Sequence, residues 1–177
     1  MGILKKIKDF VISTQIITID DLETKNFKKE EWFKTNTGLD NTPKLGILTC
    51  LIYTATKMQK IRDAINLPID ITSGYRTPEV NKAVKGSLSS KHMQGLACDF
   101  CIIGKDIEEG GKIVANACKK NKISFDKILI EKGCIHIQFN LEEKKDDNSV
   151  GFAELINGKW VTTNVELINN KWVIKNA

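Results

Sequence analysis

The sequence predicts an α+β fold: a small antiparallel sheet with flanking helices, followed by a C-terminal β-hairpin repeat. One observation is a long run, residues 43–66, in which apolar residues recur three and four apart, as in a core helix. Another is a set of short alternating segments that are typical of strands. The last two of these, residues 126–131 and 134–139, are separated only by a glycine-containing turn. Antiparallel neighbours mixed with helices indicate the α+β class.

Length and composition predict one main domain. The chain has 177 residues, of which 41% are hydrophobic and 28% charged, which is ordinary for a globular protein. We expect an amphipathic extension at 1–20, the main domain at 21–140, and a linker with two short hairpin repeats at 141–177. The net charge of +5 favours anionic partners such as an acidic wall polymer. Nucleic acid is not expected as a partner, because the sequence has neither a basic stripe with interleaved aromatics nor a zinc-finger pattern.

The N-terminal residues 1–13 predict a basic amphipathic helix, with apolar side chains at helical spacing and lysines between them. Such a helix docks on its own domain or on a partner subunit, or it lies on a membrane surface. We favour docking over membrane contact. The segment lacks the long apolar core and small-residue cleavage site of a secretory signal peptide.

The elements of the main domain follow in order. Large aromatic residues anchor a short helix within the polar residues 20–44, and the core helix follows. A strand, a short helix begun by Pro78, a loop, a second strand and a helix capped by Asp106 come next. The predicted apolar face of the core helix consists of Leu45, Leu48, Ile52, Ala55 and Met58, and the predicted strands are residues 69–73, 95–103, 126–131 and 134–139.

The C-terminal region contains an internal repeat. The text "ELINGKWV" at 154–161 returns as "ELINNKWV" at 166–173, and each copy has a tight-turn sequence between strand-like halves. Each copy therefore predicts one small hairpin. Trp160 and Trp172 either stack on a bound polymer or partner, or are buried against the main domain, and we favour burial.

The five cysteines predict reduced, inert thiols rather than a disulfide framework, because their number is odd and their spacing irregular. Cys98 and Cys101 form a CxxC motif. On a strand, residues three apart point to opposite faces, so a shared ligand or redox role is not expected there.

A metal site is indicated by side chains that face away from the apolar layer. Strand alternation places His136 and Gln138 on the polar face of residues 134–139, and Asp99 on the polar face of the second strand. His92, Asp99 and His136 form a set of two histidines and one carboxylate, which leaves a fourth position open as in catalytic zinc sites. If "KGCI" is a four-residue connection, Glu131 lies directly opposite His136 and can serve as a general base.

The segments "SGYRTPEVNKAV" and "SSKHMQGLACD" resemble the paired signatures SGYR and SxHxxGxAxD of the zinc D-alanyl-D-alanine carboxypeptidase-like peptidases. "FDKILIEKGCIHIQF" is similar to the closing segment of that family, which includes bacterial wall enzymes and phage endolysins. The resemblance covers residues 27–140 and implies the Hedgehog/D-Ala-D-Ala peptidase-like fold. The chain departs from the family at two positions. Many relatives carry the acidic base at the place of Gly133, and glutamine is common at the place of Lys91.

The resemblance implies roles for individual residues. His92, Asp99 and His136 bind Zn²⁺, and Glu131 acts as the catalytic base, as in the phage-type branch. Arg76 binds a substrate carboxylate or carbonyl, although a salt bridge that pins the loop is an alternative. The remaining candidates for substrate binding are Ser90, which alternatively caps its turn, and Gln138.

We therefore expect a zinc metallopeptidase that hydrolyses an amide bond in peptidoglycan stem peptides, as a carboxypeptidase or an endopeptidase. The alternative is a non-catalytic wall-binding or virion structural module that retains the fold. The expected partners are peptidoglycan and, for a particle-associated protein, phage virion proteins. The expected location is the host cytoplasm before release to the cell wall, or the virion.

Overall fold

The computed structural model describes residues 16–157 and 159–175, with the side chains of Leu155 and Trp160 left aside. The helix predicted for residues 1–13 lies outside the described residues, as does the choice between stacking and burial for Trp160.

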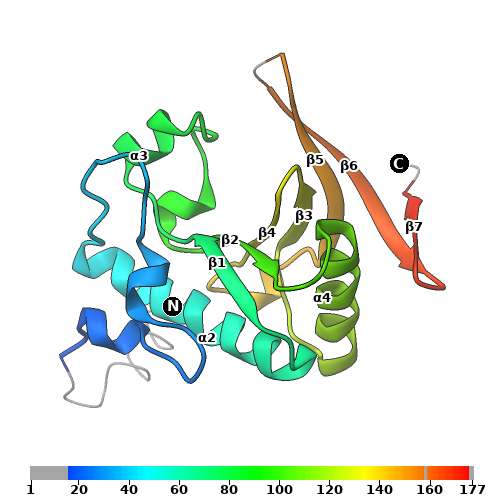
Figure 1. Ribbon diagram of the computed structural model, residues 1–177, viewed down its shortest axis with the longest axis horizontal. Helices are drawn as coiled ribbons and strands as arrows, with labels where there is room; N and C mark the ends of the chain where they lie inside the picture. Colours follow the sequence, from blue (N-terminus) through cyan, green and yellow to red (C-terminus); the bar gives the residue numbers. More distant parts are fainter. Residues whose placement is uncertain (1–15, 158, 176–177) are drawn as a thin grey trace.

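The described part of the chain is built around one seven-stranded sheet with strand order β1-β2-β4-β3-β5-β6-β7 (Figure 1). Neighbouring strands are antiparallel except for β3 and β5, which run parallel. The strands are β1 (Ile69–Ser73), β2 (Ala97–Ile102), β3 (Lys127–Glu131), β4 (Cys134–Gln138), β5 (Ser149–Ile156), β6 (Lys159–Ile168) and β7 (Lys171–Ile174).

The α+β class is confirmed and the sheet is mostly antiparallel, but it is larger than the small sheet that the sequence predicted. Strand β5 pairs in parallel with β3, with Ile128 opposite Val150, so the C-terminal strands extend the sheet of the main domain. Strands β5 and β6 pair, as do β6 and β7, but the two predicted hairpins are not separate units. They share β6, whose first half pairs with β5 and whose second half pairs with β7. The predicted domain boundaries stay a prediction.

Helices α2 and α4 pack on one face of this sheet (Figure 1). The N-caps follow the sequence signals: Thr77 Oγ1 accepts a hydrogen bond from Val80 N, and an Asp106 carboxylate oxygen accepts one from Glu109 N. The helices are η1 (Ile19–Leu22), η2 (Lys29–Trp32), α2 (Leu45–Ile65), α3 (Pro78–Ala83), η3 (Lys91–Gln94), α4 (Ile107–Asn121) and η4 (Glu143–Lys145).

The hydrophobic core lies between the helices and this sheet face. Phe100 of β2 and Ile135 of β4 are fully buried, together with Leu51 of α2 and Val114 of α4. Because strand side chains alternate, the residues between these point to the opposite face of the sheet. Helices α2 and α4 leave that second face uncovered, and the polar candidate residues lie on it.

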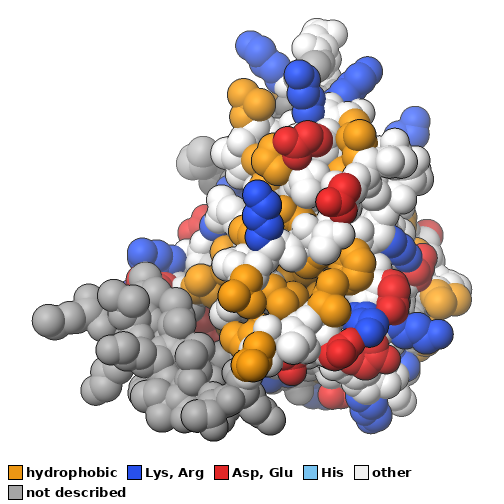
Figure 2. All heavy atoms as spheres, turned by 90° about the vertical axis from the view of Figure 1, so that its left-hand side faces the viewer, with side chains coloured by type: hydrophobic (Ala, Val, Ile, Leu, Met, Phe, Trp, Pro, Cys, Tyr) orange, Lys and Arg blue, Asp and Glu red, His pale blue; other side chains and the backbone are white. Residues whose placement is uncertain are grey.

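Helix α2 confirms the predicted core helix with one correction. Leu48, Ile52, Ala55 and Met58 are buried, whereas Leu45 is 67% exposed. Leu45 is the first residue of the helix and lies outside the core that Leu48 and the later residues join. Figure 2 shows the side of the molecule on which α2 begins, and hydrophobic side chains gather there among charged ones.

The linker after β4 is held to the main domain by a buried lysine. Lys57 of α2 donates to Glu143 Oε1 at 3.1 Å and to Ser124 Oγ at 3.0 Å. The hydrogen bond from Lys57 is the main reason that the pKa of Glu143 lies below its usual value, with partial burial opposing it. The charged linker therefore packs on the domain surface and leads the chain into β5.

All five cysteines are free thiols, as predicted. Burial raises the pKa of Cys118 to about 12, and it raises that of Cys98 well above the usual range. Thiols of such high pKa carry little thiolate and are poor nucleophiles. Among the described residues, no helix is both long and apolar enough to cross a membrane.

Candidate metal centre

Three predicted ligands, two of them from adjacent strands, meet on the side of the sheet opposite to α2 and α4. Asp99 of β2 lies directly opposite His136 of β4 in the register of the two strands. His92 comes from the short helix η3, which has Ser90 as its N-cap and Gly95 as its C-cap. All three side chains are buried, and among the described residues they are the group of metal-binding type that the structure brings together.

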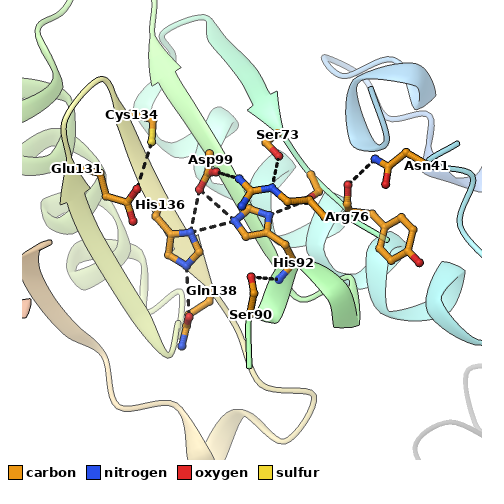
Figure 3. Close-up of polar contacts among 12 residues, drawn as sticks. Asn41, Ser73, Arg76, Ser90, His92, Asp99, Glu131, Cys134, His136 and Gln138 are labelled. Carbon is orange, nitrogen blue, oxygen red and sulfur yellow. Dashed lines mark hydrogen bonds and ion pairs between the residues drawn. The ribbon is translucent and has the colours of Figure 1, made fainter. Parts of the chain in front are cut away.

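The donor atoms converge on one point (Figure 3). His136 Nδ1 lies 2.8 Å from Asp99 Oδ1, and His92 Nε2 lies 3.1 Å from both of these atoms. Ligands of a tetrahedral zinc ion at its usual bond lengths are roughly 3.3 Å apart. Two imidazole nitrogens and one carboxylate oxygen therefore fit zinc after shifts of a few tenths of an ångström, and this donor set suits that ion.

The charges in the cluster are arranged for a cation. Burial raises the pKa of Asp99, but the neighbouring His92 and His136 outweigh it and hold that pKa well below the usual value. Burial lowers the pKa of His92. It also opposes protonation of His136, but hydrogen bonding to Asp99 outweighs it and raises that pKa. A carboxylate that stays ionised beside two imidazoles is the charge distribution that a metal site needs.

The ring orientation of His92 is fixed by the SGYR loop. His92 Nδ1 donates to the carbonyl oxygen of Gly74 at 2.6 Å, which leaves Nε2 free to face Asp99. Gly74 lies against the backbone of Trp32, and a Cβ atom at this position would be 2.3 Å from the Trp32 carbonyl oxygen. Tyr75 N also donates to that oxygen, at 2.7 Å. Glycine is therefore required here by close backbone packing.

We expect Gly74→Ala to destabilise the protein by about 2 kcal/mol, because the Trp32 backbone cannot move without disturbing the loop. In a chain of this length, that corresponds to a fall in melting temperature of roughly 4–8 °C. Thermal unfolding followed by circular dichroism measures it. Gly46→Ala is the matched control, since nothing lies within 4 Å of the added Cβ and its melting temperature should not fall. Equal melting temperatures for the two variants would contradict this role of Gly74.

Glu131 lies on the same sheet face as the ligands, but not directly opposite His136. The connection is the two-residue turn Lys132–Gly133, so Glu131 pairs with Cys134, and Leu129 is the residue opposite His136. The expected four-residue connection is wrong because β4 begins at Cys134. The Cys134 thiol lies 3.8 Å from Glu131 Oε2. Burial raises the pKa of Glu131, with nearby His136 opposing the rise.

Arg76 lies on the other side of the ligands from Glu131 (Figure 3). Its guanidinium forms an ion pair with Asp99 Oδ2 and donates from Nε to Ser73 Oγ at 2.9 Å. It thus makes the predicted salt bridge, and that salt bridge holds a metal ligand. Arg76 also lines an open hollow of about 350 Å³ together with Lys34 and Val80. The guanidinium therefore contacts a predicted metal ligand, and the same residue lines the adjacent hollow.

The two other candidates are engaged by the protein itself. Ser90 Oγ accepts from His92 N at 3.3 Å and so caps η3. Gln138 contacts His136 through Oε1, and it contacts Asp126 through Nε2. Substrate binding by either residue stays a prediction.

Asn41 is a structural residue of the site that the sequence did not reveal. Its amide donates to the carbonyl oxygens of Phe33 and Tyr75, at 2.9 and 2.7 Å, and its Oδ1 accepts from Thr77 N at 2.8 Å. These bonds hold the loop that carries Arg76. A lone polar residue in a polar stretch gives no periodic signal, so only the long-range contact exposes its role.

Comparison with known proteins identifies the family. A family model described as Peptidase M15 matches residues 21–138, which is more than half of the chain. The chain belongs to the peptidase M15 family. The match includes His92, Asp99, Glu131 and His136, and it agrees with the extent of the resemblance in the sequence. A search of the curated proteins found no significant match.

The chain is thus a metallopeptidase of the zinc D-Ala-D-Ala carboxypeptidase-like M15 family, and this family is zinc-dependent. His92, Asp99 and His136 form the possible metal site of this M15 peptidase.

Proposed function

We propose that this M15 peptidase hydrolyses an amide bond in the stem peptides of bacterial peptidoglycan, as a carboxypeptidase or an endopeptidase. The observation that carries the proposal is the placement of Glu131 and Arg76 on opposite sides of the three ligands (Figure 3). A base and an anion-binding fork that flank one metal position suit hydrolysis of a peptide with a nearby carboxylate.

Glu131 is proposed as the general base. Its carboxylate takes a proton from the attacking water while the water oxygen bonds to the scissile carbonyl carbon. The carbon–nitrogen bond then breaks, and the protonated Glu131 gives the proton to the leaving amine. The raised pKa of Glu131, caused first by burial, suits both halves of this exchange, because a base of moderate strength also returns its proton.

Zinc, when bound by His92, Asp99 and His136, supplies a Lewis acid that polarises the carbonyl and lowers the pKa of water. The other groups act on the substrate itself. Arg76 has a planar set of donors that matches a carboxylate, and the hollow beside it gives the C-terminal side of the peptide a place to lie. Lys34 lines the same hollow, and its ammonium group pairs with Asp70 at 3.4 Å.

Substitution of Arg76 tests where the substrate binds. In Arg76→Lys the charge remains but the paired donors are lost, so we expect kcat/KM on stem peptides to fall roughly 10- to 100-fold. Zinc content is measured in the same samples, because Arg76 also contacts Asp99. A fall in kcat/KM at full zinc occupancy supports substrate binding. Unchanged kcat/KM would reduce Arg76 to a residue that only pins the loop.

Digestion of purified sacculi and of synthetic stem peptides, with products identified by mass spectrometry, tests the activity and names the bond. Release of a single C-terminal residue identifies a carboxypeptidase, whereas cleavage at an internal amide bond of the stem or the cross-link identifies an endopeptidase. Zinc-loaded protein that cleaves neither substrate would contradict the proposal and favour a non-catalytic wall-binding or virion module.

We also propose an endolysin-like role, in which the protein is made in a host cytoplasm and reaches the wall on release or as part of a phage particle. The net charge of +5 supports contact with an anionic wall polymer. Five free thiols are consistent with synthesis in a reducing compartment. Fractionation of infected cells and of purified particles tests this role.

A further inference from the structure

We infer that Gln138 and Asp126 are positioning residues that fix which ring nitrogen of His136 faces the metal position. This inference rests on the proposed zinc chemistry of the site, and it adds two residues that support a ligand from outside the ligand set. Figure 3 shows the Gln138 side chain against the ring of His136, on the side away from Asp99.

Three side chains form a chain of hydrogen bonds that ends at the metal position. Gln138 Nε2 donates to Asp126 Oδ2 at 2.5 Å, and Gln138 Oε1 lies 3.2 Å from His136 Nε2. His136 Nδ1 lies 2.8 Å from Asp99 Oδ1. Both ends of the Gln138 amide are therefore engaged within the protein.

The carboxylate sets the direction of this chain. A carboxylate only accepts hydrogen bonds, so the NH₂ group of Gln138 must face Asp126. The amide oxygen is then turned toward His136, where it accepts a hydrogen bond from Nε2–H. With its hydrogen on Nε2, the neutral ring presents the lone pair of Nδ1 to the metal position. Asp126 thus acts on the metal ligand through Gln138.

The backbone holds both residues in register. Asp126 N donates to the Gln138 carbonyl oxygen at 2.8 Å, at the open end of the β3–β4 hairpin. The Asp126 carbonyl oxygen in turn accepts from Ser149 N, at 3.2 Å, at the start of β5. The C-terminal strands therefore brace the turn that carries Asp126. His92 has a simpler counterpart, since the Gly74 carbonyl oxygen fixes its ring directly.

The two assignments of Gln138 differ in what its loss changes. A residue that binds substrate affects KM and leaves zinc affinity alone. A residue that orients a ligand changes zinc affinity in the absence of substrate. Groups that hydrogen-bond the second ring nitrogen of a metal-binding histidine typically contribute 10- to 100-fold to metal affinity.

The first experiment measures the zinc dissociation constant of the full chain by competition with a chromophoric chelator. Gln138→Leu keeps the approximate volume and removes both amide bonds, so we expect the dissociation constant to rise about 10- to 100-fold. Gln94→Leu is the matched control, because Gln94 is exposed and its dissociation constant should stay unchanged. Equal zinc affinity in wild type and Gln138→Leu would overturn the inference.

A second variant and a spectroscopic measurement guard against a folding defect in Gln138→Leu. Asp126→Asn keeps the size of the side chain but allows the Gln138 amide to turn over, so zinc should again bind more weakly. In zinc-loaded wild type, nitrogen-15 NMR should show a protonated, slowly exchanging Nε2 on His136, and this signal should be lost or exchange-broadened in Asp126→Asn. A persistent signal together with unchanged affinity would overturn the inference.

Failure of this inference and failure of the proposed function give different results. Wild type that binds zinc tightly, with affinity unchanged in both variants, removes only the roles of Gln138 and Asp126. Wild type that binds no zinc removes the proposed function and the inference with it.

Discussion

Replacing Glu131 with glutamine should lower the hydrolysis rate about 1,000-fold while zinc stays bound. A positioned general base typically contributes 10²- to 10⁴-fold, and glutamine keeps the shape of the side chain without accepting a proton. Glu131 faces the ligands without being one of them, so its loss leaves His92, Asp99 and His136 in place. The measurement is initial rates on stem peptides, with zinc content determined on the same samples.

The control for this prediction is Glu154→Gln, which removes an exposed carboxylate from β5 and should leave the rate unchanged. A Glu131→Gln protein that keeps the wild-type rate at full zinc occupancy would exclude Glu131 from the mechanism. The loss of both activity and zinc would instead indicate that Glu131 supports the site structurally.

Deleting residues 149–177 should destabilise the protein severely. Strand β3 would become an edge strand, and its residues Ile128 and Ile130, now buried, would lose the cover of β5. The deletion would also remove Phe152 and Trp172, whose side chains pack against the core. Their rings meet edge to face, with the ring centroids 6.1 Å apart. A fully buried side chain of this kind contributes about 1.5–3 kcal/mol, and Phe152 and Trp172 are partly buried. Their loss, together with the lost pairing of β3 with β5, removes a large part of the typical stability of a domain.

Thermal unfolding by circular dichroism and tryptophan fluorescence tests this deletion. We expect a fall of more than 10 °C in melting temperature, or no cooperative transition. Deleting only residues 169–177 is the milder comparison, because it removes β7 and leaves β5 paired with β3. An unchanged transition after removal of 149–177 would show that the C-terminal strands form a separate unit, as the sequence predicted.

The sequence predicted the polar face of the site because that face depends on local alternation. In β2 and β4, apolar residues on one side leave Asp99 and His136 on the other, and the two strands place them opposite each other. The helix ends were equally local, since Asp106 and Pro78 act on the backbone within one turn.

What the sequence did not predict depends on pairing at a distance. The parallel contact of β3 with β5 joins segments on either side of the linker, and strand alternation carries no information about which partner a strand chooses. The place of Glu131 depended on one turn, in which Gly133 adopts a φ of 101° and closes the hairpin in two residues. The bonds from Asn41 and Asp126 likewise arise only from the assembled fold.

Metal content of the untagged protein, measured by mass spectrometry in wild type and in His92→Ala, tests the zinc site most directly. Zinc is added to both proteins, and the unbound excess is then removed by exhaustive dialysis. Circular dichroism confirms that both proteins are folded. The account predicts one zinc ion per wild-type chain and its loss in His92→Ala. Folded wild type that retains no zinc, or a variant that keeps it, would contradict the assignment of His92, Asp99 and His136 as the metal centre.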